Sequence, residues 1–264
     1  MTVFRFGRNW QNYANSLNEE LISSAEQSLC SMLGMKTLDG LSFLDAGCGS
    51  GLFSLAAIRL GAKEVISFDM DTDSVQCTNS LNEKYGPFPQ WRITRGDVLD
   101  KNWMTSLGKY DVVYSWGVLH HTGDMWQALE NIIVATRKKG ILFISIYNDQ
   151  GWTSRLWKKI KKFYNLSPTL LQLFITFTYF PLVICNRTFS GILYRIPLTQ
   201  WYKGSERGML LWYDCVDWCG GYPFETATPE QLFQFYRDRG FTLTEMKLKS
   251  GSGCNELLLK KGPS

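Results

Sequence analysis

The chain has 264 residues, of which 45% are hydrophobic, 14% aromatic and 20% charged, and these proportions exclude a disordered chain, a coiled coil and a collagen-like repeat. A chain of this length can bury a core without cross-links. Its seven cysteines include no Cys-x-x-Cys pair, which argues against a disulfide framework or a zinc module and for reduced thiols in the cytoplasm. The first residues contain no apolar secretory segment.

Short apolar runs alternate with helical segments through the first half of the chain. A helix is predicted over 16–33, where Ser16 and Glu19 have capping-box spacing and leucines recur at helical intervals. Strands that are continuous apolar runs and alternate with helices indicate a parallel sheet covered on both faces. The next predicted elements are strand 41–46, helix 52–60, strand 64–68, helix 73–84, strand 91–94, strand 110–115, helix 124–136 and strand 141–146.

This alternation stops near Asn148 and resumes near Thr228, so about 75 residues are inserted after the fifth strand. Thr228 begins a helix that ends before Gly240, and strands 241–248 and 255–260 form a hairpin. The predicted organisation is an N-terminal helical cap (1–39), a core (40–148), a basic and apolar insertion (149–227), and a C-terminal helix and hairpin that complete the core (228–264).

The clearest motif is Asp45-Ala46-Gly47-Cys48-Gly49-Ser50-Gly51, which runs directly from a predicted strand into a helix. Glycines let a backbone turn tightly and approach a ligand where any Cβ would collide. Asp69 ends the next strand 22 residues after Gly47, as an acid that accepts hydrogen bonds from ribose hydroxyls would. Because all the parts of the motif occur in order, it predicts a nucleotide site rather than only a tight turn.

Two residues indicate which nucleotide binds there. Leu52 stands where a dinucleotide loop has its third glycine, and no Lys-Ser/Thr follows the glycines, which excludes a P-loop. The Asp45 carboxylate would repel a pyrophosphate but suits cationic groups. The sulfonium and the α-amino group of S-adenosyl-L-methionine (SAM) are such groups, so the residues favour SAM over NAD.

Residues 40–148 resemble class I SAM-dependent methyltransferases, in particular the ubiquinone and menaquinone biosynthesis branch (methyltransferase types 11 and 12). The matching motifs are 44–51, 68–71, 96–98, 111–115 and 117–121. The resemblance implies an α/β fold with a Rossmann-like, seven-stranded, mostly parallel sheet, an antiparallel C-terminal hairpin and a largely helical insertion after strand five. It also implies SAM as the methyl donor and S-adenosyl-L-homocysteine (SAH) as the product.

The resemblance assigns cofactor contacts residue by residue. Asp97 has an alternative as a turn residue, because Gly-Asp is a common turn pair. The segment 6–11 is expected to fold over the cofactor. The implied contacts are Asp45, Gly47, Gly49 and Gly51 at the methionine end, Asp69 at the ribose, Met70 on the adenine, Asp97 and Val98 at its amino edge, and Ser115 and Trp116 at the floor of the pocket.

Methyl transfer from a sulfonium is an in-line displacement, so alignment and exclusion of water supply much of the acceleration. An acidic acceptor also needs a base with a near-neutral pKa. The two histidines of the chain, His120 and His121, follow the fourth strand at the edge where such sheets bind ligands. We expect at most one of them to face the cofactor. The alternative is that His121 caps the helix that begins near Asp124.

A second candidate cluster, 212–225, concentrates aromatic rings, carboxylates and a Gly-Gly turn where the insertion returns to the sheet. Tyr213, Asp214, Asp217 and Glu225 are candidates to bind or deprotonate an acceptor, and the rings to form an apolar wall. The alternative is a packed aromatic turn whose carboxylates are satisfied. No Cys/His group has metal-ligand spacing, so no metal is expected.

The insertion is predicted to be basic and apolar. Between Gln150 and Ser205 the chain has eight Lys and Arg and no Asp or Glu, which leaves the rest of a chain of net charge +4 with a charge of −4. Residues 163–186 carry no charge, and 12 of the 16 residues from 170 to 185 are apolar. A helix over 155–164 is predicted to hold Leu156, Trp157, Ile160, Phe163 and Tyr164 on one arc and Arg155, Lys158, Lys159, Lys161 and Lys162 on the opposite one.

A basic amphipathic helix beside an apolar run is typical of a segment on an anionic membrane surface, here 155–186. A lid packed on the domain and a true membrane span are the alternatives, and Pro181 and the short apolar core argue against a span. A lid that touches the bilayer could also admit a lipid-soluble acceptor.

We therefore expect a cytoplasmic methyltransferase, peripheral to the inner membrane face, that acts on a small apolar acceptor such as a quinone-like phenol or a lipid precursor. One alternative is an RNA methyltransferase, although the acidic body argues against nucleic acid. The other is a SAM-binding protein without transferase activity.

Overall fold

The protein is described by a computed structural model over residues 4, 6, 7, 10, 17–193, 195 and 211–263, without the side chain of Tyr213. Its centre is a seven-stranded sheet in the order β3-β2-β1-β4-β5-β7-β6. The first five strands are parallel, and β7 runs antiparallel to both of its neighbours, which confirms the predicted fold class. The strands are β1 (Ser42–Ala46), β2 (Glu64–Asp69), β3 (Trp91–Arg95), β4 (Tyr110–Trp116), β5 (Thr136–Tyr147), β6 (Phe241–Lys247) and β7 (Cys254–Lys261).

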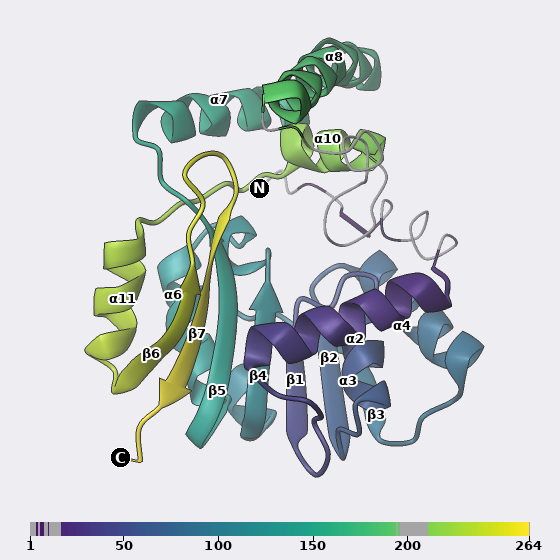
Figure 1. Cartoon of the computed structure of the whole chain (residues 1–264), viewed down its shortest axis with the longest axis vertical. Helices are drawn as coiled ribbons and strands as arrows, with labels where there is room; N and C mark the ends of the chain where they lie inside the picture. The colour runs from purple at the N-terminus through teal and green to yellow at the C-terminus, as the bar shows by residue number, and fades with distance from the viewer. Residues whose placement is uncertain are drawn as a thin grey trace.

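Helices cover both faces of this sheet (Figure 1). One face packs under α2, α3 and α4 through a core that includes Leu29, Phe43 and Leu55, and the other packs under α5, α6 and α11 through Leu129 and Leu257. The two cores meet at the sheet, whose central strands are therefore buried on both sides. The helices are α2 (Glu19–Leu33), α3 (Leu52–Arg59), α4 (Thr72–Tyr85), α5 (Lys101–Ser106), α6 (Met125–Val134) and α11 (Pro229–Arg237).

Several element ends differ from the prediction because local capping decides them. The helix predicted over 16–33 begins at Glu19, since the Asn18 side chain accepts a hydrogen bond from the backbone N–H of Leu21. Ser16 lies outside the described residues. Asp124, rather than His121, is the N-cap of α6, and its side chain accepts from the N–H of Gln127.

Two further differences arise where the sequence lacks an apolar pattern. The short helix α5 was not expected; the Asp100 side chain caps it by accepting from the N–H of Trp103. β5 begins at Thr136, five residues before the predicted start at Ile141. The prediction missed this start because the first four residues are polar, and three of them, Arg137, Lys138 and Lys139, are exposed. By contrast, α11 begins as expected, with a capping box between Thr228 and Gln231.

The insertion forms a separate layer beyond the end of β5 (Figure 1). Its described helices are α7 (Trp152–Leu166), α8 (Thr169–Leu193) and α10 (Leu211–Gly220). Edge-on ring contacts join them, with centroid distances of 5.4 Å between Trp157 and Tyr179 and 5.2 Å between Trp157 and Trp218. The insertion thus lies at the carboxyl ends of the parallel strands, the edge at which such sheets bind ligands.

α7 does not pack by its apolar arc. Its buried residues include Lys161 and Tyr164, whereas Leu156 and Phe163 are 45% and 57% exposed. Lys161, one of the five basic residues predicted on the arc opposite the apolar one, is therefore buried. The helix packs along the boundary between its two arcs, because α10 offers aromatic rings and a backbone carbonyl that accommodate an ammonium group.

α8 presents its apolar side chains outward. It continues through Pro181, one of the features that argued against a membrane span. Its 25 residues are long and apolar enough to cross a membrane. The exposed positions of α8 recur at helical spacing and include Thr178, Pro181 and Asn186. We call the apolar residues and the cysteine among them the α8 stripe: Leu170, Leu173, Phe174, Phe177, Leu182, Cys185, Phe189, Ile192 and Leu193.

Candidate cofactor and acceptor site

The glycine loop between β1 and α3 needs glycine for both its conformation and its packing. Gly47 and Gly51 have φ values of +86° and +80°, a region that side chains disfavour. A Cβ on Gly47 would collide with the side chain of Val118, and one on Gly51 would lie 2.7 Å from Cγ2 of Thr78. Glycine at these two positions therefore lets the loop turn tightly at the end of β1 and pack directly against Val118 and Thr78.

Asp45 lies beneath this loop in a buried polar chain. The Ser54 hydroxyl donates to Oδ2 of Asp45 at 2.5 Å, Ser67 donates to Ser54 at 2.7 Å, and the Trp91 indole donates to Ser67 at 2.7 Å. Burial raises the pKa of Asp45 to about 7, against the effect of the Ser54 hydrogen bond. A cation bound above the loop would favour the ionised carboxylate.

Asp69 joins the end of β2 to the glycine loop. Its Oδ2 accepts the N–H of Gly49 at 3.1 Å, and its Oδ1 accepts the N–H of Asp71 at 2.9 Å. Burial raises the pKa of Asp69 to about 6, although these backbone bonds act in the other direction. Met70, the next residue, is 57% exposed at the rim. The acid thus lies at the edge of the loop, where a ribose bound by the loop would meet it.

The remaining expected cofactor residues line the same edge of the sheet. Asp97 makes the hydrogen bond expected of a turn residue, which was the alternative to a cofactor contact: its Oδ1 accepts the N–H of Leu99 at 2.8 Å. Val98 is buried in the core. The Ser115 hydroxyl donates to the carbonyl of Ala46 at 2.8 Å and so ties β4 to β1. The indole of Trp116 donates to Oε1 of Glu256 at 2.8 Å.

The described residues of the opening segment lie along one edge of the sheet, from His121 to the glycine loop. Gly7 donates its N–H to Oδ2 of Asp71 at 3.0 Å, and a Cβ on Gly49 would lie 3.0 Å from the ring of Trp10. The ring of Phe6 lies 4.9 Å from that of His121. Arg8, Asn9 and Gln11, also expected here, are outside the described residues.

The two histidines belong to one aromatic cluster on the turn η1 (Leu119–His121) after β4. Their ring centroids are 4.4 Å apart, and those of His120 and Tyr147 are 4.0 Å apart. Nδ1 of His121 donates to the carbonyl of Pro223 at 2.6 Å, since a carbonyl only accepts. Burial lowers the pKa of His121 to about 3, so the ring is neutral at physiological pH with an acceptor lone pair on Nε2.

The segment 212–225 contains a carboxylate that caps a helix and an aromatic ring that packs near the histidines. Oε2 of Glu225 accepts the N–H groups of Gly123 and Met125 at 3.1 and 3.0 Å, so this carboxylate helps to cap α6. Asp214 and Asp217 are partly exposed on α10, which also carries the backbone of Tyr213. The ring of Trp218 is 5.5 Å from that of Tyr147, which connects α10 to the histidines.

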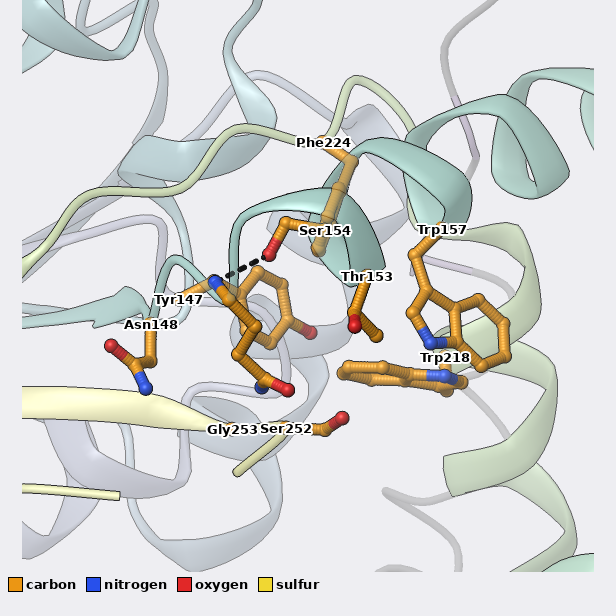
Figure 2. Close-up of a pocket in the computed structure, with 10 residues that line it drawn as sticks. Tyr147, Asn148, Thr153, Ser154, Trp157, Trp218, Phe224, Ser252 and Gly253 are labelled. Carbon is orange, nitrogen blue, oxygen red and sulfur yellow. Dashed lines mark hydrogen bonds between the residues drawn. The ribbon is translucent and has the colours of Figure 1, made fainter. Parts of the chain in front are cut away.

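A shallow recess with an accessible volume of about 10 Å³, which is room for about one water molecule, opens between the end of β5, the start of α7 and the C-terminal hairpin. Figure 2 shows Trp157 and Trp218 side by side, with Tyr147 and Thr153 next to them. Sequence reasoning missed Tyr147, although its position as the last residue of β5 was a usable signal. We call this the aromatic recess; its lining is Tyr147, Asn148, Gln150, Thr153, Ser154, Trp157, Trp218, Phe224, Ser252 and Gly253.

Comparison with a family model gives a match over more than half of the chain. The model of the family described as "Methyltransferase domain" matches residues 38–200, which begin just before β1 and end within the insertion.

Solved structures with this fold are distant in sequence. Magnesium protoporphyrin IX methyltransferase from Synechocystis PCC 6803, with bound SAH, has a TM-score of 0.54 and 17% identity, covering 93% of this chain and 89% of that one. The [4+2]-cyclase SpnF has a TM-score of 0.54 and 11% identity, covering 90% and 80%. At such identities the likeness shows the fold alone, and the two proteins differ in reaction.

Curated relatives match part of the chain. The ribosomal protein L11 methyltransferase of Agathobacter rectalis is 34% identical over 127 residues, which are 44% of this chain and 38% of that protein. The Legionella pneumophila (strain Lens) protein of the same name is 49% identical over 57 residues, 21% of this chain and 20% of its own length. The chain thus spans less than half the length of these relatives.

Proposed function

Because the chain belongs to the methyltransferase-domain family, whose class I members use SAM, we propose that it transfers the methyl group of SAM to a small apolar acceptor. The observation that carries the acceptor class is the aromatic recess, which lies at the carboxyl ends of the strands and adjoins the histidine cluster through Tyr147. Ligand pockets lined by rings with a few polar groups suit apolar ligands.

The residues around the glycine loop fit SAM. The backbone of the loop, which has positive φ at Gly47 and Gly51, would turn around the methionine end, and Asp45 below it would favour the cationic groups. Asp69 would accept hydrogen bonds from the ribose hydroxyls, and Met70 would cover the adenine. Asp97, Val98, Ser115 and Trp116 complete the proposed pocket at the ends of β3 and β4.

When bound, SAM supplies a methyl group on a sulfonium that is open to in-line attack. The chain would contribute alignment and exclusion of water, through the aromatic recess on one side and the opening segment at Trp10 on the other. Nε2 of the neutral His121 would accept a hydrogen bond from an acceptor hydroxyl and so orient it. Tyr213, Asp214 and Asp217 remain candidates on α10 for contacts with the acceptor.

We also propose that the acceptor reaches the recess from an anionic membrane surface. The α8 stripe is apolar and exposed, and Arg155, Lys158, Lys159 and Lys162 are exposed on the adjoining α7. Apolar insertion combined with basic residues is how peripheral helices bind anionic bilayers. α8 packs against α10 through Trp212, whose ring centroid is 5.0 Å from that of Phe177. This contact with α10 favours a helix that lies in the plane of the membrane surface over one that spans the membrane.

Transfer of labelled methyl groups tests the activity. The protein is incubated with methyl-labelled SAM and a lysate of its host, and the label is separated into organic-soluble, aqueous and acid-precipitable fractions. We expect label in the organic fraction. Label only in the aqueous fraction would contradict the apolar acceptor. The absence of any transfer would contradict the proposed activity and support a SAM-binding protein without transferase activity.

Sedimentation with vesicles tests the membrane surface. Replacement of the four exposed basic residues of α7 by Gln should weaken sedimentation with anionic vesicles at least about tenfold, since each is worth about 1 kcal/mol near such a surface. Lys161 is left unchanged because it is buried. A matched control replaces Lys36, Lys63, Lys101 and Lys109, which are exposed on the body. Equal loss in both variants, or no sedimentation of the parent, would contradict the proposal.

A protein acceptor is the second candidate, and the sequence similarity to ribosomal protein L11 methyltransferases favours it. The similarity covers 44% of the chain. The family model ends at residue 200 and so does not include Trp218 of the recess. Label in the acid-precipitable fraction that resists ribonuclease and yields to protease would support this candidate, whereas label released by ribonuclease would indicate RNA.

A further inference from the structure

β6 is an open edge of the sheet. It stands last in the strand order and has one neighbouring strand, β7, while α11 packs against it (Figure 1). Within the described residues, no backbone hydrogen bond joins 242–248 to any strand other than β7. Every side chain from Thr244 to Leu248 is exposed. Alternate N–H and C=O groups of β6 therefore point away from the sheet and can pair with another strand.

Apolar side chains gather at this edge. Outside the insertion, five large apolar side chains of the described residues are exposed, and three of them lie on β6, just after it or on α11: Met246, Leu248 and Phe233, at 36–55% exposure. Phe233 is on the flank of α11 that faces away from α6, because Phe235, about 200° further round the helix, contacts Trp126 of α6 at a centroid distance of 5.3 Å. We call this surface the β6 edge: Phe233, Glu245, Met246, Lys247 and Leu248.

The charges of the β6 edge alternate in sign along the strand. Glu245 and Lys247 are two residues apart and so lie on the same face of the sheet, and neither forms an ion pair among the described residues. Lys247 is the outermost member of a row of register partners that crosses four strands: Trp116, Ser145, Glu256 and Lys247. The indole of Trp116 donates to Glu256 within this row. The next place in the row, beyond the edge, therefore suits a carboxylate.

A second copy of the chain supplies that carboxylate in one register. If two β6 strands pair antiparallel about a two-fold axis at Met246, Glu245 of each copy lies opposite Lys247 of the other, and the symmetry makes this contact twice. Moving the axis by one residue, to Glu245 or to Lys247, would place like charges opposite each other, which destabilises a sheet. Charges on an edge strand normally discourage pairing, but charges of alternating sign permit pairing in this register.

We propose that two copies of this chain form a dimer through the β6 edge, with the two-fold axis at Met246, and so join their two sheets into one. The strand pair supplies main-chain hydrogen bonds. A stable interface covers about 800 Å² on each partner, which is more than one strand edge offers, so the flanking side chains Phe233 and Leu248 would be covered as well. No residue of the glycine loop or of the α8 stripe belongs to the β6 edge, so this association is separate from cofactor and vesicle binding.

Sedimentation velocity of the full-length protein measures the association. We expect a dimer at about 100 μM protein that dissociates on dilution, because one strand pair and its flanking apolar side chains make a modest interface. Glu245→Lys should raise the dissociation constant at least about tenfold, since it places like charges opposite each other twice. Met246→Lys should have an effect in the same direction. Glu83→Lys, the same charge change at an exposed position of α4, is the matched control and should stay within about twofold of the wild-type value.

Reversal of both charges tests the register itself. Lys247→Glu should also weaken the dimer, and the double variant Glu245→Lys, Lys247→Glu should restore the dissociation constant to within about threefold of the wild-type value, because opposite charges again face each other. The two single variants, each monomeric alone, should form a heterodimer when they are mixed. The melting temperature and SAH binding of each variant verify folding, and a general loss of structure would not be reversed by the second substitution.

A wild-type protein that stays monomeric at this concentration would overturn the inference, as would a dimer that Glu245→Lys and Met246→Lys leave unchanged. Absence of recovery in the double variant would overturn the register at Met246. Association through the α8 stripe is distinguished by Phe174→Ser combined with Phe189→Ser, which should leave the dimer intact. Loss of the dimer in that variant but not in Glu245→Lys would show that the copies meet through α8, and this too would overturn the inference.

Discussion

The sheet core and the insertion use the same apolar spacing with opposite results. In the core, the helical spacing of α6 buries Leu129 completely, whereas the same kind of spacing in α8 leaves Leu170 82% exposed. The stretch 151–204 of the insertion also carries eight Lys and Arg and no Asp or Glu, whereas charges of both signs are mixed in the core. Periodicity thus identifies a helix, but it does not say whether the apolar face meets the protein or another apolar phase.

The two regions also differ in how their chemistry is encoded. The cofactor loop is one contiguous motif that ends at Gly51, with its acid at Asp69. The aromatic recess has no motif, because its wall combines Tyr147 from β5, Trp157 from α7 and Trp218 from α10. We therefore expect changes in the insertion and changes in the core to act on separate functions, and the following predictions test that separation.

The largest effect is expected when the α8 stripe is made polar. The triple variant Phe174→Ser, Leu182→Ser, Phe189→Ser removes three side chains that are 63–67% exposed. Because burial of each is worth about 1.5–3 kcal/mol, partition into anionic vesicles should fall about a thousandfold, as measured by flotation. Phe233→Ser with Leu248→Ser on the body is the control. Unchanged flotation would show that the stripe does not contact the bilayer.

In the core, we expect Asp69→Ala to weaken SAM binding about a hundredfold in isothermal titration calorimetry. The variant removes hydrogen bonds to a charged acceptor and frees the N–H of Gly49. The α8 stripe variant should bind SAM as the wild-type protein does. An unaltered dissociation constant in Asp69→Ala would refute the assignment of the ribose acid.

A smaller effect is expected from pH. The Asp69 carboxyl has a pKa of about 6 and binds the ribose hydroxyls best when ionised, so SAM affinity should fall about tenfold from pH 7 to pH 5. Asp45, with a pKa of about 7, acts in the same direction. Asp69→Asn should flatten the profile, and a flat profile in the wild-type protein would contradict the prediction.

Stability of the ligand-free fold should show the reverse trend. Both carboxyls have folded pKa values above their unfolded value of 3.8, so the stability that they contribute is present below pH 3.8 and is lost as pH rises to 7. Urea unfolding at several pH values measures it. Asp45→Asn should remove the larger part of this pH dependence, because the pKa of Asp45 is raised further above 3.8 than that of Asp69.

The smallest effect is expected from Leu170→Ala. The side chain is 82% exposed, so the free energy of unfolding should change by less than about 0.5 kcal/mol in urea titrations. Leu129→Ala, at a fully buried leucine, should cost about 2–5 kcal/mol in the same assay. A comparable loss at Leu170 would mean that the stripe packs on the protein in solution.

Most of the sheet could be predicted because buried parallel strands are continuous apolar runs. β1 and β2 lie within one residue of their predicted ends. The start of β5 at Thr136 could not be predicted, since its first residues are polar. The start of α2 depends on which of several polar residues caps it, and the Asn18 side chain does so.

The cofactor loop was predictable because it is local in sequence, whereas the acceptor side depends on distant contacts. Nδ1 of His121 bonds to Pro223, 102 residues away, and this bond decides which nitrogen of the ring is a donor. In the sequence, Lys161 is one of five basic residues predicted on the arc opposite the apolar one. Its burial follows from α10, which supplies the carbonyl and the ring of Trp218 from 57 residues further along the chain.

The position of Cys185 on the α8 stripe has a practical consequence. It is the one exposed cysteine of the seven, and Cys48 and Cys77 beside the cofactor loop are buried, with thiol pKa values that burial raises. A thiol-reactive, polarity-sensitive dye should therefore attach preferentially to α8. Its emission would report the depth of the helix in a bilayer in real time, while the methyl-transfer chemistry proceeds unlabelled on the other side of the insertion.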